Sequence, residues 1–294
     1  MEPGLVTRKS VAAREQGAAG LLALRSQRLT GVVRITMSCT LPPEILDLIV
    51  DHLHDQPTAL KACCVVSKSW VPRTRKHLFA RIEFCALKSS VEQWKNVFPD
   101  PSNSPAHYAR TLFFHGLAAT TTADPDVGSW IRTFHRVVTL RMNSLGCDDS
   151  RISLVQLHGL SPNLKSFHLI HSSLPLSEIF SFICSFPLLE DLGFYTTSRN
   201  DTGGWDIPST SPKLTGSLRI MGIIQSAARR LCDLPGGLRF SKITVSCSKR
   251  DVQSLMDLVS RCSGTLESFS VSYYPSSAST SVSDWSRSHR YSPT

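Results

Sequence analysis

The sequence predicts an α/β fold: a small all-α pair of helices, followed by an irregular open solenoid in which strands and helices alternate and the strands run parallel. Three observations predict this fold. Residues 41–84 carry two short helical patterns of apolar residues, a β-like run recurs after residue 105, and segments of helical spacing lie between the runs. A chain of 294 residues can hold one such medium domain beside a small module.

The first predicted helix begins at about Pro42, because proline is tolerated in a first helical turn, where the amide that it lacks would have no partner. Glu44 and Asp47 lie near this start, where carboxylates favour the positive end of the helix dipole. The apolar positions follow helical spacing and make one face apolar: Ile45, Leu46, Ile49, Val50 and Leu53.

A second helix is predicted from Ala59 to about Trp70. The segment 55–58 interrupts the first helix, Thr58 is the expected N-cap, and Pro72 is expected to close the helix. Two such short helices are too small to bury a core of their own. We therefore expect their apolar side to pack against something else.

Residues 41–84 resemble the F-box, the motif by which substrate receptors dock on the Skp-family adaptor of cullin-RING (SCF-type) ubiquitin ligases. The match covers nearly every expected apolar position and includes Lys68-Ser69-Trp70. The stretch from Lys61 to Phe79 is most similar to the F-box families expanded in mushroom-forming (basidiomycete) fungi. By this resemblance the adaptor-binding residues are Leu41, Pro42, Glu44, Ile45, Leu46, Ile49, Leu53, Leu60, Val65, Val66 and Trp70.

The resemblance also implies that Trp70 lies near the junction between the adaptor and the domain that follows. From the residues alone, the alternative is an ordinary helical hairpin packed on its own domain.

The second half of the chain repeats a short β-like run. In most runs the pattern is apolar-x-x-apolar-x-apolar, and the central residues are 25 to 28 positions apart. This period and pattern are those of leucine-rich repeats, which have one strand and one helix or turn per repeat. The central residues are Leu112, Leu140, Phe167, Leu192, Leu218, Ile243 and Phe269.

Helical spacing between the runs predicts right-handed crossovers between parallel strands, for example at 176–186 and 251–262. A doubly wound α/β sheet would contain the same elements, but it would place a phosphate loop or catalytic residues at its strand ends, and the sequence shows neither. Prolines precede several runs, as in the divergent leucine-rich repeats that follow many F-boxes. Residues between the apolar positions alternate outward, where they could contact a substrate: Arg141, Asn143, Lys165, His168 and Tyr195.

The two ends of the chain differ in composition from its middle. The first 36 residues are basic and poor in acids, which predicts a flexible leader, with an organellar transit peptide as the alternative. The run at Phe269 leads directly into a Ser-rich tail with no capping repeat. The expected segments are a disordered leader (1–36), an F-box (37–84), a linker (85–104), a repeat domain (105–274) and a disordered tail (275–294).

Charge and cysteine content narrow the possible partners and compartment. The net charge is +9, but it is scattered and lacks interleaved aromatic residues, so we expect no nucleic-acid partner. Nine cysteines without a CxxC pair predict a reducing compartment, cytoplasmic or nuclear. No apolar run approaches the ~18 residues of a membrane span, so we expect no membrane association.

Motifs for catalysis are missing from the sequence, which contains no GxSxG, P-loop, GxGxxG or HExxH pattern. His168 and His171 have no third ligand at a suitable spacing, so we expect no metal, no cofactor and no enzymatic activity. The expected function is that of a substrate receptor whose repeat domain presents a protein to the ligase. The alternatives are a repeat scaffold without ligase coupling and a basic nucleic-acid binder.

Overall fold

The computed structural model describes eight stretches of the chain. The expected leader (1–36) and Ser-rich tail (275–294) lie outside these stretches. The described residues from 43 to 273 belong to one compact unit. The described residues are 41–84, 89–115, 125–143, 154–170, 174–196, 210–222, 224–248 and 251–273.

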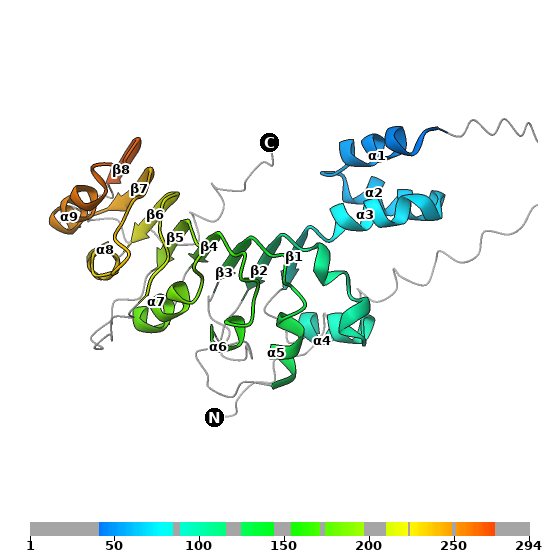
Figure 1. Cartoon of the computed structure of the whole chain (residues 1–294), viewed down its shortest axis with the longest axis horizontal. Helices are drawn as coiled ribbons and strands as arrows, with labels where there is room; N and C mark the ends of the chain where they lie inside the picture. The colour runs from blue at the N-terminus through cyan, green and yellow to red at the C-terminus, as the bar shows by residue number, and fades with distance from the viewer. Residues whose placement is uncertain are drawn as a thin grey trace, which may run out of the picture. The chain divides into compact units, whose positions relative to one another are not determined.

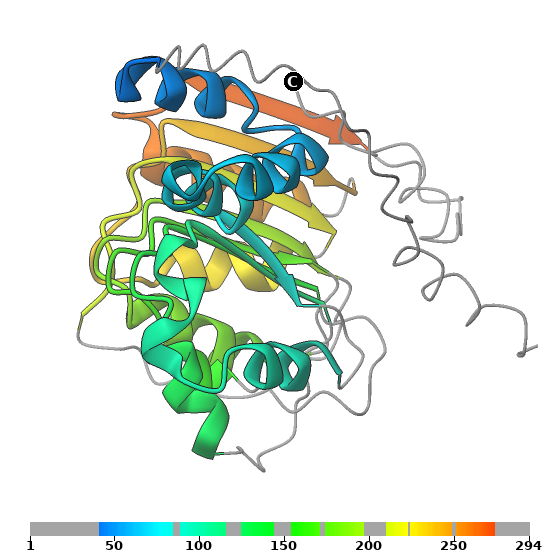
Figure 2. The same ribbon diagram turned by 90° about the vertical axis from the view of Figure 1, so that its right-hand side faces the viewer.

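An eight-stranded sheet forms the centre of this unit, and its strands follow one another in chain order (Figure 1). In Figure 2 the strand colours pass in the same order, from orange at β8 through yellow and green to cyan at β1. All seven pairings are parallel. The strands are β1 (Arg81–Phe84), β2 (Thr111–His115), β3 (Thr139–Asn143), β4 (Ser166–Ile170), β5 (Asp191–Thr196), β6 (Ser217–Gly222), β7 (Lys242–Cys247) and β8 (Ser268–Tyr273).

The register of the sheet confirms the repeat that the sequence predicts. The central apolar residue of each run is the partner of the next, from Leu112 opposite Leu140 to Ile243 opposite Phe269. Ile82 of β1 extends this row beyond Leu112. These residues form an apolar ladder in which all members except Phe269 are buried.

Helices connect the strands and cover one side of the sheet, where α4 to α9 lie in Figure 1. The expected helical segments at 176–186 and 251–262 are confirmed by α7 and α9. Strands β2, β3 and β4 alternate between buried and half-buried residues. The helices are α4 (Ser89–Val97), α5 (Pro125–Ile131), α6 (Leu154–Leu157), α7 (Leu176–Cys184), α8 (Ile224–Cys232) and α9 (Val252–Cys262).

Strand order separates the open solenoid from the doubly wound sheet. A doubly wound sheet reverses its order at a switch point and has helices on both faces. Here the order runs from β1 to β8 without reversal, and the alternating burial is that of a sheet with one covered face. The fold is therefore α/β, with parallel strands arranged as in an open solenoid.

The segment expected to be a linker, 85–104, is wrong in part, because it contains α4 and the 3-10 helix η2 (Pro101–Asn103), followed by η3 (Pro105–Tyr108). Trp94 of α4 packs against Phe79, Phe84 and Phe98. Phe84 also stacks on Phe114 of β2. We name these five aromatic residues the aromatic junction, and α4 contributes Trp94 to it. Arg81–Phe84 form β1 and so belong to the sheet rather than to the preceding helices.

Between residues 41 and 80, all of them described, lie three α-helices and not two. They are α1 (Pro43–His52), α2 (Pro57–Val66) and α3 (Val71–Leu78), with η1 (Lys68–Trp70) before α3. The predicted cap at Thr58 is wrong, because Pro57 already occupies the first turn of α2 and Gln56 stands at the N-cap. Pro72 begins α3 rather than closing α2, since proline fits a first helical turn.

Replacing Leu192 by alanine tests the apolar ladder. Leu192 is fully buried in β5, between Phe167 and Leu218. We expect Leu192→Ala to lower the free energy of unfolding by about 2–5 kcal/mol, because it removes buried methyl groups and leaves a cavity. Urea unfolding followed by circular dichroism measures this loss. The control is Thr244→Ala on the uncovered side of β7, expected to change stability by less than about 0.5 kcal/mol. Equal effects would contradict the assignment of the covered face.

Candidate functional site, an apolar surface on the helical module

The helical module, residues 43–78, has very little core. Of its apolar side chains, all of which belong to the described residues, only Val50, Leu60 and Cys63 are buried. The core of the sheet begins at Ile82 and does not include them. Helix α3 contacts both α1 and α2, so the module is organised around it.

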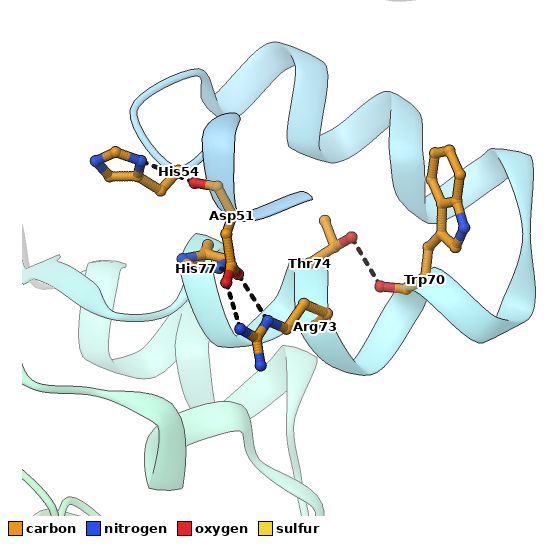
Figure 3. Close-up of polar contacts among 6 residues, drawn as sticks. All are labelled: Asp51, His54, Trp70, Arg73, Thr74 and His77. Carbon is orange, nitrogen blue, oxygen red and sulfur yellow. Dashed lines mark hydrogen bonds and ion pairs between the residues drawn. The ribbon is translucent and has the colours of Figure 1, made fainter. Parts of the chain in front are cut away.

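A polar clamp joins α1 to α3 (Figure 3). Arg73 donates to Asp51 through Nε, at 2.6 Å from Oδ1, and through Nη2 to Oδ2. His77 Nε2 lies 2.6 Å from the same Oδ1. Arg73 and His77 are one turn apart on α3, which places both beside one carboxylate.

The charges of the clamp compensate two unfavourable helix positions. Asp51 lies in the last turn of α1 and Arg73 in the first turn of α3, where the helix dipoles disfavour their charges. Hydrogen bonds from Arg73 and then from His77 hold the pKa of Asp51 well below its ordinary value of 3.8. The hydrogen bond to Asp51 in turn raises the pKa of Arg73. Asp51 is therefore ionised across the physiological pH range.

Two further hydrogen bonds fix the ends of these helices. Thr74 Oγ1 is buried and donates to the carbonyl oxygen of Trp70 at 2.8 Å. His54 Nδ1 lies 2.9 Å from the carbonyl oxygen of Asp51. Trp70 stands at the start of α3, whereas β1 follows the other end of that helix (Figure 1). The connection to the sheet is made by Phe79 and the aromatic junction, not by Trp70.

The surface of the module is unusually apolar. Val65, Val66 and Leu48 expose 87%, 69% and 56% of their surface. In α1 the exposed apolar residues recur at helical spacing and form a stripe. We name these residues, together with two valines of α2, the exposed apolar set: Ile45, Leu48, Ile49, Val65 and Val66.

Most of the predicted adaptor-binding residues lie at this surface. Exposed are Leu41, Pro42, Glu44, Ile45, Ile49, Val65 and Val66; half-buried are Leu46, Leu53 and Trp70.

Leu60 is the exception, because it is buried inside the module and cannot contact a partner directly. It faces inward since α2 packs on α3 along that side. Leu48 of α1 is also exposed at this surface, and it is not among the predicted adaptor-binding residues. Leu48 follows Ile45 by three residues and Leu41 by seven, and this helical spacing already indicated that it lies on the same face of the helix.

The residues expected on the uncovered face of the sheet divide into two groups. Arg141, Asn143, His168 and Tyr195 occupy strand positions that alternate with buried residues. Lys165 does not belong to a strand. It precedes β4, and its Nζ pairs with Glu190 Oε1 at 3.1 Å.

Chemically reactive groups are few among the described residues. No group of three or more His, Cys, Asp or Glu side chains there is placed to hold a metal ion. Burial raises the pKa of Cys184 to about 11 and also raises the pKa of Cys262, so these thiols stay protonated at neutral pH. In the same described part of the chain, no helix has the length and apolar character needed to span a bilayer.

Comparison of the sequence with protein-family models and with curated proteins gave no match. The site is therefore interpreted from its own residues.

Replacing Asp51 by asparagine tests the clamp. We expect Asp51→Asn to destabilise the protein by about 1 kcal/mol at neutral pH, because solvent weakens a pair whose carboxylate is about one third exposed. A group whose pKa is lowered by folding stabilises the folded state above its unfolded pKa. The difference between wild type and variant should therefore be full above about pH 5 and shrink as the pH falls below 3.8.

Urea midpoints measured from pH 7 down to the acid range provide the readout for this prediction. The matched control is Glu44→Gln, which removes an exposed carboxylate at the other end of the same helix. A stability difference for Asp51→Asn that does not change with pH would contradict the role of the ionised carboxylate.

Proposed function

We propose that this protein is an F-box substrate receptor. In this proposal residues 37–84 dock on the Skp-family adaptor of a cullin-RING (SCF-type) ubiquitin ligase, and the parallel sheet with its helices is a leucine-rich-repeat-like solenoid that presents a protein substrate. The observation that carries the proposal is the exposed apolar set on a module with only three buried apolar side chains.

The free energy available from this surface supports docking. Burying one large apolar side chain completely contributes on the order of 1.5 to 3 kcal/mol. Leu48, Val65 and Val66 together could offset much of the entropy lost on association, and a few central residues usually dominate such an interface. An isolated domain gains nothing from leaving these side chains in water.

The polar clamp supports the same proposal. It holds α1 against α3 through Asp51, Arg73 and His77, so the helices can keep their arrangement without using the exposed apolar set. A surface that is already arranged loses less conformational entropy on binding. The module therefore has the features of a preformed docking element.

The receptor would act by holding its substrate in a fixed position relative to the other parts of the ligase. Holding a substrate near the ubiquitin-charged enzyme raises its effective concentration, and this requires no bond chemistry from the receptor itself. The uncovered face of the sheet is available for a substrate, because the helices from α4 to α9 lie on the other side (Figure 1). We place this activity in the cytoplasm or nucleus, in line with the free cysteines among the described residues.

A repeat scaffold without ligase coupling is the alternative. That function predicts that the helical module buries its apolar side on residues 80–140. Helix α3 does contact η3, yet five apolar side chains of α1 and of the end of α2 stay exposed: Ile45, Leu48, Ile49, Val65 and Val66. This exposure favours docking over the scaffold.

Co-purification with a fungal Skp-family adaptor tests the proposal. We expect the full chain to bind the adaptor and the variant Leu48→Ala/Val65→Ala to bind at least about 100-fold more weakly, because two truncations of about 1.5 kcal/mol each are lost from the interface. Isothermal titration calorimetry measures both affinities. Both residues are exposed, so the variant should keep its urea midpoint.

The matched control is Leu188→Ala/Met256→Ala, which removes exposed apolar side chains outside the module. It should bind the adaptor as wild type does. Unchanged affinity of the Leu48/Val65 variant would reject the docking surface, and so would an equal loss in the control.

A further inference from the structure

The uncovered face of the sheet carries a cluster of basic residues in one row. The register places Arg141 of β3 opposite His168 of β4, His168 opposite Gly193 of β5, and Gly193 opposite Arg219 of β6. Two guanidinium groups therefore flank one histidine and one glycine across four adjacent strands. These four residues are not members of the apolar ladder, and the described helices α4 to α9 pack on the other side of the sheet (Figure 1).

Gly193 makes room for the His168 ring. A Cβ added at Gly193 would lie 2.3 Å from His168 Nδ1, closer than any real contact. The ring therefore lies over the glycine, and its Nε2 is 3.0 Å from Ser166 Oγ. Between Arg141 and Arg219 the surface is therefore formed by the flat His168 ring, and no side chain projects from position 193.

Arg141 has hydrogen-bonding capacity that the fold does not use. Its Nε is buried and has no hydrogen-bond partner among the described residues, so the fold leaves one donor of this guanidinium group unpaired. No carboxylate among the described residues forms an ion pair with it. Asp191, the acid on the neighbouring β5, already accepts from the backbone N and the Oγ of Ser217.

The charge of this cluster is positive at neutral pH. Burial, followed by the charges of Arg141 and Arg219, lowers the pKa of His168 to about 4, against the smaller opposite effect of the Asp191 carboxylate. His168 is then neutral, and the two guanidinium charges outnumber the single carboxylate charge of Asp191. Exposed Lys242 of β7 extends the basic character toward the last strand.

We propose that Arg141, His168 and Arg219 bind an acidic segment of a protein substrate through its carboxylate groups. Guanidinium groups match carboxylates in a two-pronged geometry, and the His168 ring offers a flat surface between them. As an assignment to a substrate this rests on the proposed function, but the binding itself does not require the adaptor.

The spacing of the two arginines suggests the form of the segment. Arg141 and Arg219 are three strands apart, and a strand separation of about 4.8 Å puts them roughly 14 Å apart. An extended chain rises about 3.3 Å per residue, and every second side chain points to the same side of it. Carboxylates four residues apart, about 13 Å, would meet both arginines from the same side of the segment.

Fluorescence anisotropy with the full chain tests this inference. The probe is a labelled ten-residue peptide with two glutamates four positions apart in a Ser/Thr/Gly background, and its twin has glutamine at both positions. We expect the glutamate peptide to bind, the glutamine twin not to bind, and Arg141→Gln or Arg219→Gln to weaken binding at least about tenfold. The matched control Arg229→Gln, an exposed arginine of α8, should bind as wild type does.

Three outcomes would overturn the inference: equal binding of both peptides, unchanged binding by Arg141→Gln, or equally tight, Arg141-dependent binding of single-stranded RNA. Urea midpoints of the variants show that they are folded.

Two variants separate this inference from the proposed function. Arg141→Gln should keep adaptor affinity, and Leu48→Ala/Val65→Ala should keep peptide affinity. A chain that binds the adaptor but not the peptide rejects only this inference, whereas one that binds the peptide but not the adaptor rejects only the proposed function.

Discussion

The apolar ladder of the parallel sheet is the constraint on which the rest of the structure depends. The central residue of each strand must lie opposite the central residue of the neighbouring strand, as Leu140 lies opposite Leu112 and Phe167. The chain must then return to the start of the next parallel strand. Parallel pairing needs a long crossover, and the described helices α4 to α9 lie on one side of the sheet (Figure 1). The alternate residues of β3 and β4, among them Arg141 and His168, therefore face the side that these described helices leave uncovered.

The helical module contributes nothing to this core, and this explains its surface. Its helices are held by Asp51, Arg73 and His77 and by a small apolar contact around Val50 and Leu60. The aromatic junction at Trp94 and Phe84 attaches the first strand without using the apolar stripe of α1. One fold therefore presents two different surfaces: an apolar surface before the sheet and a basic surface on its uncovered face.

Sequence reasoning predicted the parts that depend on period, and it missed the parts that depend on packing. The seven central residues were predicted in register because a fixed period leaves few other pairings. The strand at Ile82 was missed because it lies inside the F-box-like segment, and α4 was missed because it is short and its order depends on the aromatic junction. The burial of Leu60, the exposure of Leu48 and the contact of His168 with Gly193 depend on side-chain positions in three dimensions, which spacing does not determine.

We expect an adaptor to cover the exposed apolar set and to leave the sheet free for another partner. Hydrogen–deuterium exchange of the full chain, alone and with a fungal Skp-family adaptor, measures this coverage. Peptides from residues 41–66 should exchange more slowly with the adaptor, and exchange in β3 to β6 should not change. Binding that leaves 41–66 unprotected, or that protects the face bearing Arg141 and His168 instead, would contradict this expectation.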